Sequence, residues 1–357
     1  MSRWKGNALT MELYGESHAP AVGVKLSGFP ALKLDTARLQ AFLERRRAKD
    51  SRISTPRGEP DRPVFLKGLS EGVLSGEAVA EIANTNVKSG DYAELYGNPR
   101  PSHADYVSYV KYGTLDFSGG GAFSGRLTAP FCVAGGIAKQ ALAAQGISVL
   151  AYVQAAGGVE GKSYRDSSVS PEEIRRSGEE LFPALSRGGE MRAAIESARA
   201  AGDSVGGVVE CLAFGVPAGL GGPYGEGLEG AIAGLVFAIP AVKGVEFGGG
   251  FSLCPMRGSA ANDPLRIRGG AVVTETNRSG GINGGISNGM PVALRVGFRP
   301  TPSISLPQET VDLVKRENTT VQIRGRHDAC IVPRAVPVVE SAVALALWDI
   351  ILGGNNG

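Results

Sequence analysis

The chain has 357 residues, of which 43% are hydrophobic, with 37 Lys and Arg residues against 35 Asp and Glu residues. This composition is typical of a folded protein and argues against a disordered chain. A net charge of +2 argues against a protein whose main partner is nucleic acid or an anionic membrane. The 52 Gly residues follow no three-residue collagen period, so they predict many turns instead.

The chain is expected to form a single large domain over residues 1–357, because no segment has the composition of a linker. Residues 353–357 are expected to form a flexible tail. The four Cys residues are far apart and lack CxxC spacing, which favours a reducing environment over a disulfide framework. The N-terminus has no apolar signal-peptide core, and the apolar runs at 231–241 and 342–352 are too short to span a membrane. We therefore expect a soluble, cytoplasmic protein with no nucleic-acid or membrane partner.

Hydrophobic periodicity and capping residues predict the regular elements. Asp35 or Thr36 can cap a helix that carries Leu39, Phe42 and Leu43 on one face. Short strands and apolar helices in mixed order predict an α+β fold with helices layered between sheets. In chain order, the predicted elements are a strand at 23–26, the helix beginning at 35 or 36, a helix at 126–144, a strand at 148–154, a helix begun by the capping box at 170–173, a helix over 190–201 stopped by Gly202, a strand at 207–214, a helix at 227–237, strands at 244–247, 271–276 and 292–298, and a helix at 338–352.

Five long glycine-rich, polar segments have neither helical nor strand periodicity. Loops of this length in a compact domain are usually functional or disordered, and their charged and aromatic residues favour function. We therefore expect a functional site built from the segments 15–19, 45–61, 84–124, 247–289 and 299–328.

All three histidines, His18, His103 and His327, lie within or at the edge of these polar segments. A single histidine is more often structural than catalytic, but three of three in aperiodic loops favour function. A zinc site made by histidines distant in sequence stays open, yet no HxxxH pair or nearby cysteine supports one. No metal is therefore expected.

The glycine triplets at 119–121 and 248–250 could hold a phosphate group through backbone N–H groups or simply form tight turns. Neither has the strand, spacing and acidic residue of a dinucleotide-binding motif. Arg126, Arg326 and Arg334 lie in or beside the polar segments, where bidentate contacts would suit a polyanionic small molecule. The residues alone thus predict a cytosolic enzyme acting on a phosphorylated anion and leave its reaction open.

Ordered blocks of residues recur along nearly the whole chain. They are Gly-Glu-Ser-His at 15–18, Arg-Arg-Arg at 45–47 with Ser-Arg at 51–52, Arg-Pro-Ser-His-Ala-Asp at 100–105, Gly-Arg-His-Asp-Ala-Cys at 325–330, Arg-Ala-Val-Pro at 334–337, and further blocks at 84–86, 111–113, 243–248 and 276–282. Together these blocks resemble the chorismate synthase family.

The resemblance implies a carbon–oxygen lyase that converts 5-enolpyruvylshikimate 3-phosphate to chorismate by 1,4-elimination of phosphate, the last common step of aromatic amino acid biosynthesis. It also implies reduced FMN as the cofactor, with NADPH as one source of its electrons. The implied fold is a β-α-β sandwich with antiparallel sheets, and the implied assembly is a homotetramer. The departing C–H group is not acidic, so a reduced flavin would supply electron density as phosphate leaves.

The resemblance also assigns catalytic roles. His18 matches the general acid beside the leaving phosphate, with Ser17 in its relay. His103 matches the residue that protonates or hydrogen-bonds the reduced flavin, with Ser124 in its relay. Asp328 matches the carboxylate that works with the flavin during removal of the ring proton.

Binding roles follow in the same way. Arg46 and Arg52 match contacts to NADPH or to the substrate, and Arg126 and Arg334 are candidates for binding the substrate's anionic groups. The family commonly has Arg-Ser where this chain has Ala-Phe at 122–123, so this part of the flavin contact is expected to be altered. The implied flavin contacts are Ala122, Phe123, Ser124, Pro240, Ala241, Gly284, Arg299, Pro300, Thr301, Pro302, Ser303 and Arg326.

Two alternatives stay open from the sequence. A nicotinamide-dependent oxidoreductase acting on a phosphorylated substrate would share the glycines and arginines, although the dinucleotide motif is missing. A non-enzymatic module that binds a phosphorylated ligand would use the histidines only structurally. Phosphate release stimulated by flavin, with no net use of NADPH, separates the proposed lyase from both.

Overall fold

The computed structural model describes residues 2–17, 19–47, 50, 52–54, 59–85, 95–117, 120–323 and 328–354. His18 and Arg326, two of the predicted site residues, lie outside these ranges, as does His327. Gly353 and Gly354, which begin the predicted tail, belong to the C-terminal helix, and residues 355–357 lie outside the described ranges.

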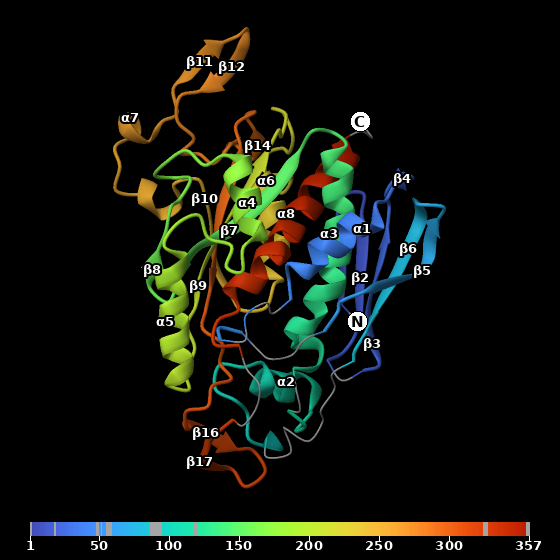
Figure 1. Ribbon diagram of the computed structural model, residues 1–357, viewed down its shortest axis with the longest axis vertical. Coiled ribbons are helices and arrows are strands. Elements are labelled where there is room, and N and C mark those ends of the chain that lie inside the picture. The colour runs from blue at the N-terminus through green and yellow to red at the C-terminus, as the bar shows by residue number, and fades with distance from the viewer. Residues whose placement is uncertain are drawn as a thin grey trace.

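Two antiparallel sheets enclose a layer of helices (Figure 1). The first sheet consists of β1 (Ser2–Lys5), β2 (Thr10–Gly15), β3 (Ala21–Ser27), β4 (Leu32–Lys33), β5 (Pro63–Ser70) and β6 (Val73–Ala83), in the order β1-β2-β3-β6-β4 with β5 also paired to β6. The second sheet consists of β7 (Ser148–Ala156), β8 (Val159–Glu160), β9 (Gly207–Phe214), β10 (Val242–Phe247) and β15 (Val292–Phe298), in the order β10-β15-β9-β7-β8. Two-stranded hairpins are formed by β11 (Leu265–Arg268) with β12 (Ala271–Thr274), β13 (Ile282–Asn283) with β14 (Ile286–Ser287), and β16 (Gln308–Asp312) with β17 (Glu317–Val321).

The layer between the sheets consists of α3 (Thr128–Ala143), α6 (Leu228–Phe237) and α8 (Val332–Gly354). Helix α3 contacts β3 and β6 of the first sheet, whereas α8 packs against α3 and contacts β7 and β9 of the second sheet. Burial on both sides explains why α3 and α8 are apolar around most of their circumference, whereas α6 leaves Gly230, Gly234 and Phe237 exposed. The remaining helices are α1 (Thr36–Glu44), α2 (Asp105–Tyr112), α4 (Pro171–Glu179), α5 (Gly188–Ala200) and α7 (Gly258–Ala261), with short 3₁₀ helices η2 (Gly121–Phe123), η3 (Gly125–Leu127) and η4 (Gly250–Leu253).

Both faces of β7 are buried. Val149, Ala151 and Val153 belong to the main core together with the residues of α8, whereas Tyr152 packs in a separate cluster with Ile174 of α4. Successive side chains of a strand point to opposite faces, so α4 covers the face of the second sheet that is turned away from the central helices.

The predicted α+β fold with helices between sheets is confirmed. Asp35 caps α1 by accepting a hydrogen bond from the backbone N–H of Arg38, at 3.0 Å. The capping box that begins α4 is present, and the strands predicted at 207–214 and 292–298 are β9 and β15. Local signals were therefore reliable where a capping residue or a short, largely apolar run was present.

Several elements lie where the sequence predicted loops. Helix α2 lies within 84–124, strands β11, β13 and β14 lie within 247–289, and β16 and β17 lie within 299–328. These short polar elements bury no continuous apolar face, so they lack the periodicity on which the prediction depended. Strands β5 and β6 were also missed. In β6 the buried face includes two alanines, which have weak strand propensity.

Helix α8 is longer than the predicted helix at 338–352, because it continues back through Pro337 to Val332. Among the described residues, it is the one helix long and apolar enough to cross a membrane by length and composition. However, 89% of its most apolar stretch is buried inside the protein, as in a core helix.

The loops that carry most of the predicted site residues lie near one end of the molecule. In Figure 1, α2 and the β16–β17 hairpin lie at this end, and the β11–β12 hairpin projects at the opposite end. Thr310 of β16 donates its hydroxyl to the backbone oxygen of Pro99, at 2.5 Å, and so fixes the hairpin to the segment that precedes α2.

Candidate active site

Asp61 connects two of the predicted arginines. Its carboxylate is 1% exposed and accepts hydrogen bonds from Arg46 on Oδ2, with Nε at 3.1 Å, and from Arg126 on Oδ1. Burial alone would raise the pKa of Asp61, but the charges of the two arginines outweigh burial and lower that pKa. Glu59 forms a second ion pair with Arg126, at 2.6 Å. Both guanidinium groups are thus held by buried negative charge at neutral pH.

Asn84 joins Arg126 to the turn that contains Ser17. The side-chain oxygen of Asn84 accepts a hydrogen bond from Arg126 Nε at 2.8 Å. Its amide nitrogen donates to the backbone oxygens of Ala19, at 2.6 Å, and Glu16, at 3.1 Å. The predicted relay residue Ser17 is therefore tied to a predicted anion-binding arginine.

Asp328 and Arg334 lie beside this group. Arg334 donates from Nη1 to Asp328 Oδ2 at 2.6 Å and from Nε to the backbone oxygen of Arg46 at 3.2 Å. Their side chains are 24% exposed for Arg334 and 14% exposed for Asp328. Asp328 is thus connected through Arg334 to Arg46. Asp61 connects Arg46 in turn to Arg126, so one network contains all of these residues.

The segment before β9 joins Asp328 to the predicted flavin-binding segment. The backbone N–H of Val205 donates to the oxygen of Ala329, which follows Asp328, at 2.8 Å. The Ser204 hydroxyl donates to the backbone oxygen of Thr301 at 2.7 Å. Two loops that are distant in sequence are thereby fixed next to each other.

His103 lies in the turn before α2 and is oriented by Asp105. Its Nδ1 is 2.5 Å from Asp105 Oδ1, and Arg100 donates to both oxygens of the same carboxylate, at 2.7 and 2.8 Å. Burial alone would raise the pKa of Asp105, but the hydrogen bonds from Arg100 and His103 outweigh it and hold that pKa at about 2. Because Nδ1 is engaged by Asp105, Nε2 is the ring atom left for a ligand.

Arg299 brings the predicted flavin segment to the His103 turn. It donates from Nη2 to the backbone oxygen of Ser102, at 2.6 Å, and its backbone N–H donates to Ala241 at 3.0 Å. Ser102 and Ala241 both have left-handed backbones, with φ of 56° and 71°. Non-glycine residues rarely adopt this conformation, and such positions cluster at ligand sites.

Two of these loops contain three buried polar atoms that lack a hydrogen-bond partner among the described residues. They are Ser17 Oγ, Arg299 Nε and Thr301 Oγ1. Buried polar groups are normally paired, so these atoms fit a site that is completed by a polar ligand or cofactor. Within the described part of the chain, no three His, Cys, Asp or Glu side chains gather as a potential metal site.

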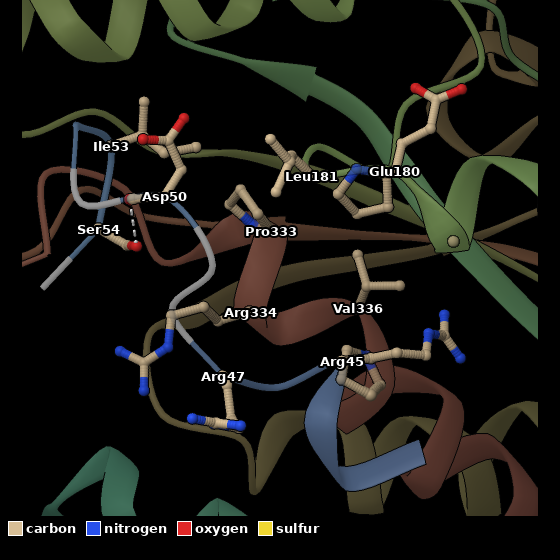
Figure 2. Close-up of a pocket in the computed structure, with 13 residues that line it drawn as sticks. Arg45, Arg47, Asp50, Ile53, Ser54, Glu180, Leu181, Pro333, Arg334 and Val336 are labelled. Atoms are coloured by element: carbon tan, nitrogen blue, oxygen red, sulfur yellow. Dashed lines mark hydrogen bonds between the residues drawn. The ribbon is translucent and has the colours of Figure 1, made fainter. Parts of the chain in front are cut away.

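A pocket beside the network is lined by Arg47, Asp50 and Arg334 (Figure 2). Figure 2 shows the guanidinium groups of Arg47 and Arg334 on the same side of the pocket, with that of Arg45 turned away from them. Arg45 instead pairs with Glu340 at 2.8 Å. Arg47 is exposed and forms no ion pair within the described ranges.

Arg52 binds Asp50, one of the residues that line this pocket, and is the most exposed of the predicted arginines that the structure describes. Its side chain is 63% exposed and donates to both oxygens of Asp50, at 3.0 and 2.9 Å. Asp50 also pairs with Arg192 at 2.7 Å. The hydrogen bond from Arg52 is the main reason why the pKa of Asp50 falls to about 2.

Ser124 joins the network, whereas its two predecessors are exposed. The hydroxyl of Ser124 accepts a hydrogen bond from the backbone N–H of Arg126 at 3.2 Å and caps η3. Ala122 and Phe123 lie in η2, and Phe123 is 45% exposed. Its ring is therefore accessible to a planar ligand.

Gly284 is not brought to the other predicted flavin residues. It is exposed, and its neighbour Gly285 accepts a hydrogen bond from the backbone N–H of Leu228, the first residue of α6, at 3.0 Å. Ala241 follows the C-terminal end of the same helix. The ten residues of α6, about 15 Å in length, separate the two positions.

Several residues that hold the site together were not singled out from the sequence. Asp61 and Glu59 are acidic residues among arginines, and an anion site predicts the arginines without predicting their partners. Asn84, Arg100 and Asp105 lie in the family blocks at 84–86 and 100–105, so block membership was the signal that could have found them.

Comparisons with known proteins identify the family of the chain. The family model described as chorismate synthase matches residues 9–352. The chorismate synthase of Thermococcus kodakarensis is 49% identical over 351 residues, which cover 98% of this chain and 97% of the relative. That of Aeropyrum pernix is 47% identical over 354 residues, covering 97% and 92%. A solved crystal structure of chorismate synthase superimposes with a TM-score of 0.77 at 26% identity, covering 99% of this chain and 94% of that one. The chain belongs to the chorismate synthase family.

Proposed function

We propose that the protein is a lyase that eliminates phosphate from 5-enolpyruvylshikimate 3-phosphate to give chorismate, with reduced FMN as its cofactor. The observation that carries this proposal is the family match over residues 9–352. The connected network of arginines and carboxylates at one end of the fold supports it, because guanidinium N–H groups suit a phosphorylated polyanion. The nicotinamide-dependent oxidoreductase has no support, since the relatives described above are chorismate synthases.

The residues present fit a flavin. Thr301, Arg299 and Ser17 offer polar atoms that are buried and unpaired within the described ranges, and the accessible ring of Phe123 suits packing on a flat ring system. When bound, reduced flavin supplies electron density to the substrate as phosphate leaves and recovers it as hydrogen is lost. The proposed contacts are Ala122, Phe123, Ser124, Pro240, Ala241, Gly284, Arg299, Pro300, Thr301, Pro302, Ser303 and Arg326.

Proton transfer is assigned to the histidines and to Asp328. Asp105 fixes the His103 ring through Nδ1, so Nε2 is positioned to donate to or accept from the cofactor. Asp328 is held by Arg334, which keeps a carboxylate available near the reacting groups. His18 is proposed as the acid for the leaving phosphate, with Ser17 beside it. The role of His18 rests on the family resemblance alone.

Anion binding is assigned to arginines that remain accessible. Arg334 is 24% exposed and Arg126 is 10% exposed, so each can offer N–H groups to a phosphate or carboxylate. Arg46 and Arg52 are proposed to contact the substrate or NADPH. Arg52 is 63% exposed, whereas Arg46 is 5% exposed and already donates to Asp61 and Thr128.

A homotetramer in the cytoplasm completes the proposal. Gly284 is exposed and lies near the N-terminal end of α6, whereas Ala241 follows the C-terminal end of that helix. In an oligomer, a neighbouring copy can supply one of these two contacts. Sedimentation of the full chain tests this assembly, and a monomer that is fully active would contradict it.

One assay tests the proposed reaction. The full chain is mixed under anaerobic conditions with chemically reduced FMN and 5-enolpyruvylshikimate 3-phosphate, and phosphate and chorismate are measured together. We expect equal amounts of both products and no net consumption of reduced flavin. Absence of phosphate release under these conditions would contradict the proposal.

A further inference from the structure

The buried carboxylate of Asp61 pairs with two arginines of the site. Asp61 accepts from Arg46 on one oxygen and from Arg126 on the other. Among the described residues, Asp61 is the one acidic residue that pairs with both of them, because Glu59 pairs with Arg126 alone. Two guanidinium groups brought so close together repel each other unless a negative charge lies between them.

The location of Asp61 shows what this arrangement joins. Arg46 follows helix α1 and donates to Thr128 at the start of α3, at 3.2 Å. Arg126 donates to the backbone oxygen of Ala83 at the end of β6, also at 3.2 Å. Asp61 therefore fixes the end of α1, the start of α3 and the end of β6 relative to one another.

The backbone of Asp61 also indicates a constrained position. Its φ of 44° is in the left-handed region, which asparagine and aspartate tolerate better than most residues. Its side chain is 1% exposed, so solvent does not compete for the two ion pairs. Such a conformation persists where the surrounding contacts determine it.

We propose that Asp61 is a positioning residue for the elimination reaction, an inference that rests on the proposed function. It holds Arg46 and Arg126 in one arrangement, from which Arg126 presents its remaining N–H groups to the anionic substrate. Through Asn84, the same contact fixes the turn of Ser17. Asp61 itself touches neither the substrate nor the cofactor.

The first test is the variant Asp61→Asn, which preserves volume and removes the charge. We expect kcat to fall at least tenfold with saturating substrate, because the arginines lose their common partner. The matched control is Asp349→Asn: Asp349 is 4% exposed and accepts three backbone N–H groups of residues 7–9, away from the site. The control is expected to lower the melting temperature and keep kcat. Equal kcat in Asp61→Asn and the wild type would overturn the proposal.

A binding measurement gives a second readout that does not depend on flavin or turnover. Inorganic phosphate is titrated calorimetrically into the wild type and Asp61→Asn. If the negative charge of Asp61 acted only by repelling anions, its removal in Asp61→Asn would tighten phosphate binding. If Asp61 instead holds the two arginines in place, Asp61→Asn should bind phosphate at least fivefold more weakly. Tighter binding would overturn the proposal. If the wild type releases no phosphate from the substrate, the proposed function fails, while this comparison still tests the positioning role.

A double variant addresses folding. Arg46→Met combined with Asp61→Asn removes a buried ion pair as a unit, which proteins tolerate better than removal of one partner. If Asp61 acts through Arg46, the double variant loses less kcat/KM than the product of the two single losses. A purely multiplicative loss would overturn this route of action. Where Asp61→Asn alone does not fold, the double variant is compared with Arg46→Met alone, and a much lower kcat/KM in the double variant would overturn it.

Discussion

Two consecutive arginines form ion pairs with two different buried carboxylates. Arg45 pairs with Glu340 of α8 at 2.8 Å, and Arg46 pairs with Asp61 in the loop before β5. Glu340 is 0% exposed and Asp61 is 1% exposed, and each carboxylate lies between two cations. The chemistry of the two groups is the same, but their surroundings differ.

The group around Glu340 is closed. Its oxygens accept from Arg45, from Lys139 of α3 and from the backbone N–H of Ala151 in β7 at 2.9 Å, so it joins the central helices to the second sheet. The group around Asp61 is open. It continues through Arg126 and Asn84 to a turn that contains an unpaired buried hydroxyl. Buried carboxylates that each pair with two cations can therefore stabilise the fold in one place and form part of a site in another.

The largest effect on turnover is expected at His103, in the turn before α2. His103→Ala should lower kcat by about 10²–10⁴, the range for loss of general acid–base help, while the fold is kept because Asp105 remains paired with Arg100. Steady-state kinetics with reduced FMN measure this. Tyr106→Ala, at an exposed position of α2, is the control and should keep kcat. Wild-type turnover in His103→Ala would refute the assigned role.

The closed group should show the opposite pattern. Glu340→Gln leaves Arg45 and Lys139 without a buried counter-charge, so we expect the free energy of unfolding to fall by about 3–5 kcal/mol. Turnover of the folded fraction should stay within twofold of the wild type. Urea unfolding and kinetics on the same samples check both statements. A large loss of turnover without a loss of stability would contradict the distinction between the two groups.

Acid should weaken the His103 region over a defined pH range. The pKa of Asp105 is about 2 in the folded protein, below its ordinary value near 4, so its ionised form stabilises the fold. This contribution is complete above about pH 4 and is lost as the pH falls from 4 towards 2. Asp105→Asn should therefore lower the free energy of unfolding by about 1–2 kcal/mol at pH 7. The difference from the wild type should shrink below pH 4, as measured by urea unfolding at several pH values, and a difference independent of pH would contradict this assignment.

The comparison also indicates how far the sequence predicts the fold. Helices α1 and α4 were predicted because a capping side chain acts on neighbouring residues. The start of α8 was missed because Pro337 is a poor residue for a helix interior, and burial of the whole segment between two sheets overrides that local preference. Tertiary packing therefore determines where α8 begins, which local sequence preferences do not predict.

The site was predictable as a set of residues and not as an arrangement. The sequence assigned Arg46 to NADPH or the substrate and Arg126 to the substrate's anionic groups. It did not show that Arg46 is buried behind Asp61, whose left-handed backbone no sequence pattern specifies. Gly284 was assigned to the same cofactor as Ala241, and only the fold reveals that α6 separates them. Contacts between distant loops carry information that block spacing does not contain.

The smallest effect is expected where the arginine is exposed. Arg52 is 63% exposed and its partner Asp50 keeps Arg192, so Arg52→Ala should leave the melting temperature nearly unchanged. If Arg52 guides the anionic substrate, KM should rise by about threefold to tenfold at low salt and by less at high salt, since salt screens exposed charges. The control is Arg187→Ala. Arg187 directly precedes α5, is 50% exposed and pairs with Glu190. Measuring KM at two salt concentrations separates the outcomes: an increase that is independent of salt would assign Arg52 a direct hydrogen bond to the substrate, and an unchanged KM would remove Arg52 from the site altogether.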